Sequence, residues 1–92
     1  MKQIDFIWKM KGLGLNVLQT TDTVVQATLA PEVILEHSTH VNHEQITLVI
    51  GEIGSDDEVD YMIDDNPTLL EKVIKLHESN ASKEDYITAF RR

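Results

Sequence analysis

Apolar and polar residues alternate along most of the first 50 residues, which is the spacing of half-buried β-strands. The alternation is clear in segments 13–19 and 23–30, and Pro31 ends the second because proline donates no hydrogen bond to a central ladder. A short strand is expected at 32–38. Segment 45–53, QITLVIGEI, is almost continuously β-branched and aliphatic, so we expect a central strand there, buried on both faces.

Residues 3–10 fit two structures. Four apolar residues alternate with polar ones, interrupted only by Ile7: Ile4, Phe6, Trp8 and Met10. This period of two favours a strand, turned by Lys11-Gly12 into the next one, with Trp8 in the core; an interface anchor is the alternative for Trp8. A helix over the same residues, ending at Gly12, is the alternative.

Helix-capping residues become frequent after residue 54. Ser55 and Glu58 match the S-x-x-E capping box, in which the two side chains accept hydrogen bonds from backbone N–H groups at a helix start. We therefore expect a helix from about residue 56, with Val59, Met62 and Ile63 as its buried stripe.

Two further helices are expected toward the C-terminus. Asn66 can cap a helix that begins at Pro67 and carries a wide apolar face over residues 69–76. Thr68 and Glu71 offer a second capping box in the same segment. The last helix is expected to open at Ser82 with Asp85, and its inward and terminal residues are Tyr86, Ile87, Phe90, Arg91 and Arg92.

Strands followed by helices, without alternation, indicate an α+β fold rather than a parallel α/β sheet. We expect an antiparallel sheet of four to five strands in the N-terminal half, with two to three helices from the C-terminal half packed on one face. The 92 residues suffice for a single domain, residues 1–92, and are too few for a second hydrophobic core.

The composition excludes several kinds of chemistry and location. Cysteine is absent, which excludes disulfides, thiolate catalysis and cysteine-ligated zinc or iron–sulfur clusters. The N-terminal residues have no uninterrupted apolar core and no small-residue cleavage site, so we expect no signal peptide and a cytoplasmic protein. The longest apolar runs are far shorter than a membrane span, so we expect no membrane partner.

Negative charge is concentrated in the middle of the chain. The net charge is −8, and the 60 residues from 12 to 71 hold twelve carboxylates and no lysine or arginine. Such a surface repels nucleic acid and attracts basic proteins. A helix–turn–helix over 73–92 meets the same objection, because its second helix would begin Lys83-Glu84-Asp85 and present carboxylates to phosphates. We therefore expect no direct nucleic-acid binding.

Three of the four histidines lie within seven residues: His37, His40 and His43, between Glu36 and Glu44. Imidazole and carboxylate are common metal ligands. However, residues three apart in a strand point to opposite faces, and no compact zinc motif is present. We interpret the segment as a polar hairpin loop without a bound metal. The alternatives are a metal site and a face whose histidines the glutamates help to protonate in acid.

Segment 51–65 carries seven carboxylates in fifteen residues. In the expected helix, Asp56, Asp60 and Asp64 fall at i, i+4 and i+8 and line one stripe, about 6 Å apart along the axis. Asp57 adds charge beside this stripe, and Tyr61 offers an aromatic anchor. A row of carboxylates can imitate a nucleic-acid backbone and occupy a basic groove on another protein, whereas an ordinary solvated helix face is the alternative.

These features predict a small, acidic, non-enzymatic protein–protein interaction domain, such as an inhibitor or regulator. Its expected contact residues for a basic protein partner are Asp56, Asp57, Asp60, Tyr61 and Asp64, and we expect no cofactor. The alternative is a structural or assembly subunit that forms a homodimer or larger oligomer through its sheet, because segment 45–53 would be adhesive at a sheet edge.

Overall fold

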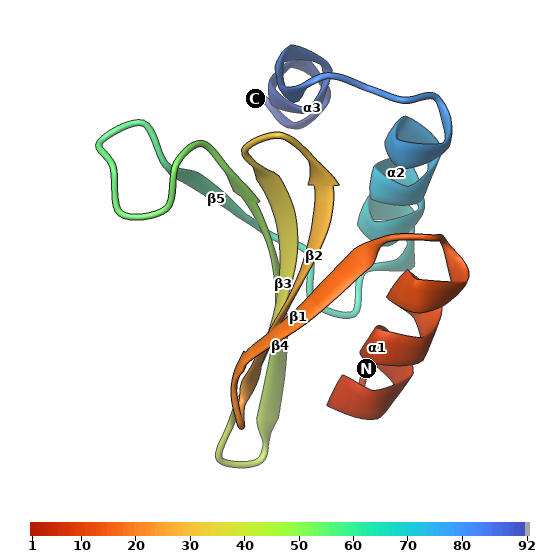
Figure 1. Ribbon diagram of the computed structural model, residues 1–92, viewed down its shortest axis with the longest axis vertical. Helices are drawn as coiled ribbons and strands as arrows, with labels where there is room; N and C mark the ends of the chain where they lie inside the picture. The colour runs from red at the N-terminus through yellow and green to blue at the C-terminus, as the bar shows by residue number, and fades with distance from the viewer. Residues whose placement is uncertain (92) are drawn as a thin grey trace.

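The computed structural model describes residues 1–91 as a five-stranded antiparallel sheet with helices packed on one face (Figure 1). The strands are neighbours in sequence order, so the sheet is a meander. In chain order the elements are α1 (Gln3–Gly12), β1 (Asn16–Thr21), β2 (Val24–Ala30), β3 (Val33–His40), β4 (His43–Ile50), β5 (Val59–Met62), α2 (Pro67–Glu78) and α3 (Lys83–Phe90). The α+β class, the antiparallel sheet and the C-terminal helices are confirmed.

Two-residue turns join the first four strands. The β2–β3 turn is Pro31-Glu32 and the β3–β4 turn is Val41-Asn42, and Glu32 and Asn42 adopt φ angles of 59° and 60°. In each turn only the second residue is left-handed, so neither is a type I′ or II′ turn, and the β2–β3 register shifts between Thr28 and Ala30. Pro31 ends its strand as expected, and the alternating segments 13–19 and 23–30 contain β1 and β2, although β1 begins only at Asn16.

The pleat of the sheet separates a covered face from an open one. Leu35 and Leu48 are paired across β3 and β4, and Val25 lies in the next row, on β2. All three side chains are fully buried on the covered face. The helices close this core with five buried side chains: Phe6, Met10, Val73, Tyr86 and Phe90. β4 is an interior strand of the sheet, as predicted, but on its other face only Val49 is buried, so the prediction of burial on both faces holds for that residue alone.

The expectation of a strand at residues 3–10 is wrong, and the alternative helix is the observed structure. Phe6 and Met10 are four residues apart, so they lie on the same side of a helix and both are buried. Ile4 and Trp8 share the opposite side and are 57% and 69% exposed. The expectation that Trp8 belongs to the core is therefore also wrong. The segment after Gly12 turns the chain back onto the sheet instead of forming a strand-to-strand hairpin.

The helix expected from residue 56 is absent. Residues 51–58 form a loop, and Val59–Met62 is the edge strand β5, paired antiparallel with β4 from Ile50↔Val59 to Thr47↔Met62. Pairing with β4 fixes these residues in an extended conformation, in which Asp60 and Tyr61 point to opposite faces. The stripe of Asp56, Asp60 and Asp64 consequently does not form.

The two C-terminal helices follow the capping residues. Asn66 Oδ1 accepts hydrogen bonds from Thr68 N at 3.0 Å and Leu69 N at 3.2 Å, and Pro67 is the first residue of α2. The second capping box, Thr68 with Glu71, is wrong because Asn66 holds the cap position. Ser82 and Asp85 form the predicted capping box of α3.

Two further C-terminal predictions concern the residues after α3 and the arrangement of α2 and α3. Arg91 follows α3 directly, whereas Arg92 lies outside the described residues. Helix α3 contacts α2 and β4, and Figure 1 shows the two helices crossing rather than running antiparallel. No helix within residues 1–91 is long and apolar enough to cross a bilayer.

Tyr86 provides a test of the core. Its side chain is fully buried, and its hydroxyl has no hydrogen-bond partner within residues 1–91. We expect Tyr86→Phe to raise the free energy of unfolding by about 1 kcal/mol, because the ring packing is kept and an unsatisfied buried group is removed. Urea denaturation measures this change. Tyr61→Phe, at a half-buried position, is the matched control and should change stability little.

The same hydroxyl predicts a pH dependence. Burial raises the pKa of Tyr86 to about 12 from its ordinary value of 10. The folded state therefore holds this proton more tightly than the unfolded state, and stability from this source is lost as the pH rises from 10 to 12. Wild type should lose about 2 kcal/mol more than Tyr86→Phe over this range. Parallel losses in both proteins would contradict the assignment.

Candidate functional site

The loop 51–58 is held by the polar residues that suggested a helix cap. Ser55 Oγ accepts a hydrogen bond from Asp57 N at 3.2 Å and donates one to Glu52 O at 2.7 Å. Glu58 Oε1 accepts from Gly54 N at 3.0 Å. The two side chains thus bond backbone groups as in a capping box, but they close a turn because the following residues join the sheet.

We use the name acidic end for Asp56, Asp57, Glu58 and Asp60, which lie in this loop and at the start of β5. Asp56 and Asp57 are exposed in the loop, and Asp60 is exposed on the open face of the sheet. Three of the carboxylates proposed from sequence thus lie within five residues of one another along the chain, but the groups that act on Asp60 are Glu58 and Glu36. Glu58 was missed as a site residue because the sequence pattern assigned its side chain to a helix cap.

Asp60 lies in an unfavourable environment for its own charge. Burial raises the pKa of Asp60 above 3.8, and the charge of Glu58, a hydrogen bond with Glu58 and the charge of Glu36 raise it further. Glu36 lies on the same open face, on β3, where Gln26 Nε2 donates to its Oε2 at 3.0 Å. Strand alternation alone would have placed Glu36 on the face opposite Leu35, but only pairing through β4 brings it toward Asp60.

The acidic end is not neutralised by the rest of residues 1–91. Other carboxylates of the chain have cationic partners: Asp65 with the Met1 ammonium at 2.9 Å, Glu71 with Lys75 at 3.4 Å and Glu32 with Lys83 at 2.7 Å. None of the ion pairs in this part of the chain involves the acidic end. The cation that interacts with the acidic end is Lys83. Its hydrogen bond with Glu32 raises its pKa most, and the charges of Glu32, Glu84 and Asp57 raise it further.

Tyr61 lies on the helix-covered side of β5, where its ring centroid is 5.7 Å from that of Phe90. A groove of about 380 Å³ runs along the free edge of β5 and is lined by Asp60, Tyr61, Met62, Leu69 and Phe90. The groove therefore joins an aromatic pair from one side of the strand to a carboxylate from the other. Lys72 Nζ lies 4.9 Å from the centroid of the Phe90 ring, a cation–π distance.

Asp64 does not belong to this group. It follows β5 at the opposite end of the strand from the loop, with a φ of 47°, and its Oδ1 accepts a hydrogen bond from Ile46 N at 3.3 Å. Asp64 N in turn donates to Ile46 O at 3.0 Å. These bonds give Asp64 a local role in ending the β4–β5 ladder.

The three clustered histidines do not converge. His37 is fully buried on the covered face; its Nε2 lies 2.6 Å from Met1 O and 3.8 Å from Glu44 Oε1, and its ring packs on Phe6. His40 and His43 are exposed and pair across the hairpin on the other face. Within residues 1–91, no three histidine, aspartate or glutamate side chains are placed to hold a metal.

The polar hairpin loop expected at this segment is therefore only partly correct. The turn itself is Val41-Asn42, whereas His37 is a buried strand residue. His37 Nδ1 has no hydrogen-bond partner within residues 1–91. Because Met1 O is an acceptor, the ring donates from Nε2, and Nδ1 is left unpaired in the core. The acid-dependent change of this face remains a prediction.

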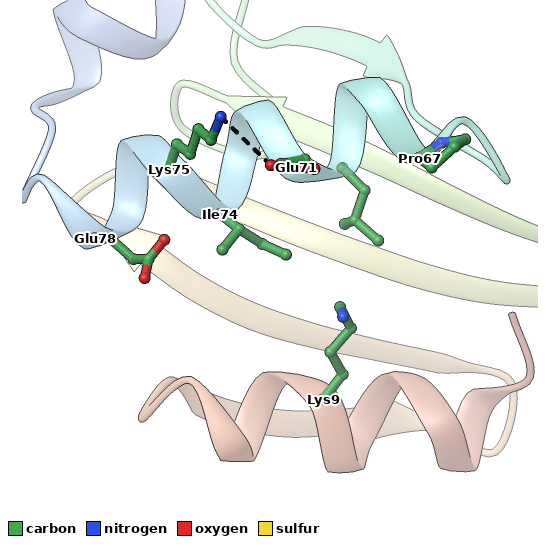
Figure 2. A pocket seen from close by; sticks show the side chains of 7 residues that line it. Lys9, Pro67, Glu71, Ile74, Lys75 and Glu78 are labelled. Atoms are coloured by element: carbon green, nitrogen blue, oxygen red, sulfur yellow. Dashed lines mark ion pairs between the residues drawn. The ribbon is translucent and has the colours of Figure 1, made fainter.

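A second groove, of about 360 Å³, separates α1 from α2. Figure 2 shows Lys9 pointing from α1 toward α2, with Ile74 and the Glu71–Lys75 ion pair on the opposing side. Its apolar floor and charged rim contain no histidine, serine or tyrosine. Its charged residues are Lys9, Glu71, Lys75 and Glu78, of which Glu71 and Lys75 form an ion pair.

Comparison with known proteins found no matching family, no similar curated protein and no similar solved structure.

Two glycines test the loop that carries the acidic end. Gly51 has a φ of 106°, and a Cβ there would lie 2.7 Å from Asp57 O, whereas Gly54 has a φ of 84° and open space around it. We expect Gly51→Ala to lower the free energy of unfolding by about 3 kcal/mol, from backbone strain and the clash together, and Gly54→Ala by about 1 kcal/mol from strain alone. Chemical denaturation of both variants checks this order, and equal losses would contradict the close approach.

Replacing Asp60 by asparagine should give a pH-dependent gain in stability. Its raised pKa means that the folded state disfavours the charged carboxyl, so its ionisation lowers stability at all pH values above that pKa. Asp60→Asn should therefore be more stable than wild type at pH 7. The difference should vanish as the pH falls through the raised pKa and then below 3.8, where Asp60 is protonated in both states. Asp56→Asn, in the exposed loop, is the control for urea titrations across this range.

Proposed function

We propose that the protein is a small non-enzymatic interaction domain, an inhibitor or regulator, that binds a basic protein partner through the acidic end and the groove along β5. The observation that carries the proposal is the unneutralised charge: none of the ion pairs within residues 1–91 involves the acidic end, although carboxylates elsewhere are paired. Lysine or arginine side chains of a partner would relieve the mutual repulsion of Glu58, Asp60 and Glu36.

The groove supplies the second requirement of a stable interface. Strong binding is concentrated in a few desolvated anchors, and charge mainly speeds association and selects the partner. Tyr61, Phe90 and Leu69 offer apolar contact beside Asp60. A partner segment that carries a cation next to an aliphatic or aromatic residue would match this combination. We propose that this contact takes place in the cytoplasm, in keeping with a chain without cysteine.

Direct binding of nucleic acid is not part of the proposal. The first turn of α3, the helix that would enter a groove in a helix–turn–helix protein, carries Glu84 and Asp85. The net charge of −8 opposes approach to phosphates. Assembly through segment 45–53 is also not favoured, because β4 lies between β3 and β5 and has no free edge.

The test is a pull-down from native lysate with two charge-reversal variants. The triple variant Asp56→Lys, Asp57→Lys, Asp60→Lys changes the acidic end, and the control Glu71→Lys, Glu78→Lys, Glu84→Lys changes exposed residues of α2 and α3. Both variants carry a net charge of −2, because each reversal adds two units. The partner should be captured by wild type and control and lost with the first variant.

Salt provides an independent check. Capture by wild type should fall at least about tenfold between low and high salt, because screening shortens the range of the attraction. Circular dichroism and urea denaturation establish that both variants are folded. Equal capture by the two triple variants would refute the role of the acidic end, and capture that is insensitive to salt would refute the electrostatic basis.

A further inference from the structure

Strand β5 leaves a row of backbone hydrogen-bonding groups unused. It lies at the edge of the sheet and pairs only with β4 (Figure 1). Just beyond the strand, Ile63 N donates to Ile46 O at 2.8 Å, so the backbone of Ile63 faces β4. Because this orientation alternates along an antiparallel strand, the N–H and C=O groups of Asp60 and Met62 point away from the sheet. Within residues 1–91, no backbone hydrogen bond outside the ladders uses these four groups.

The groove along β5 offers side-chain contacts on both faces of this edge. Asp60 and Met62 project on the open face, and Met62 is 47% exposed. Tyr61 projects on the covered face, where Phe90 and Leu69 line the same groove. A strand added to β5 would direct alternate side chains to these two faces, so each set would meet a different lining.

Charge determines which face of an added strand would be basic. On the open face, Asp60 and Glu36 are both negative and interact with each other. On the covered face, Lys72 Nζ lies 4.9 Å from the centroid of the Phe90 ring and would repel a second cation. The matching strand therefore carries lysine or arginine opposite Asp60 and an aliphatic residue opposite Tyr61.

The same charges argue against another copy of this chain as the occupant of the edge. A pair of two β5 strands would bring the Glu58 and Asp60 carboxylates of both copies together. The other edge strand, β1, holds no cation that could pair with Asp60. A helical segment is also a poor match, because its backbone groups bond within the helix and cannot pair with those of β5.

We infer that the basic partner binds as an extended segment that adds a sixth strand to the sheet at β5, with its cations on the open face and its aliphatic residues on the covered face. This inference rests on the proposed function and adds the conformation and the residue pattern of the partner segment. β5 has four residues, so a segment of about five residues is long enough. The alternation of faces is the same whether the added strand is parallel or antiparallel.

Two synthetic peptides of equal composition and charge test the residue pattern. In the first peptide lysine and valine alternate, and in the second all lysines precede all valines. Isothermal titration calorimetry with the full chain measures both affinities. The alternating peptide should bind at least about tenfold more tightly, because only its extended form sets cations opposite Asp60 and valine opposite Tyr61. Equal affinities, or no binding of either peptide, would overturn the inference.

Backbone N-methylation of the alternating peptide tests strand pairing directly. The N–H groups of its lysines and of its valines point to opposite edges of an extended chain, so only one set can face β5. Methylation of the set that faces β5 should weaken binding at least about tenfold, and methylation of the other set should leave it nearly unchanged. The same effect from both sets contradicts strand addition.

Met62→Pro tests the same bonds from the side of the protein. It removes an N–H group that points away from β4, so the β4–β5 ladder is kept. Met62→Val keeps this N–H group and is the matched control. Met62→Pro should weaken binding of the alternating peptide about tenfold relative to Met62→Val. In wild type, hydrogen exchange of the Asp60 and Met62 amides should slow when the peptide binds, and unchanged exchange at both would count against the inference.

The triple variant Asp56→Lys, Asp57→Lys, Asp60→Lys separates failure of this inference from failure of the proposed function. If the two peptides bind wild type equally and both lose affinity for the triple variant, the acidic end binds cations without an added strand, and only the inference fails. If the triple variant binds both peptides as tightly as wild type does, the acidic end is not a site for basic segments, and the proposed function fails as well.

Discussion

Alternate residues of a strand point to opposite faces of the sheet, and in this protein helices cover only one of those faces. This constraint decides where each candidate group lies. His37 enters the core under α1, while His40 and His43 stay in solvent. Tyr61 packs on Phe90, while Asp60, its neighbour in sequence, joins Glu36 on the open face. A shift of one residue in the β4–β5 register would exchange these positions and bury a carboxylate.

Local signals in the sequence predicted what local interactions determine. Asn66, Ser82 and Asp85 cap their helices through hydrogen bonds that span only a few residues, so the pattern alone was sufficient. Residues 3–10 were ambiguous because apolar residues spaced by two also recur at a spacing of four. Burial of Phe6 and Met10 against the sheet selects the helix, and that partner surface is made by residues far along the chain.

The acidic segment shows the opposite case, in which correct local chemistry led to the wrong element. Ser55 and Glu58 do accept hydrogen bonds from nearby backbone groups, as in a cap. A helix over 56–65 would have placed like charges at i and i+4, whereas the extended form gains a ladder with β4. Only the pairing with β4 revealed that Glu36 and Asp60 share a face, so the site could be predicted by composition but not by geometry.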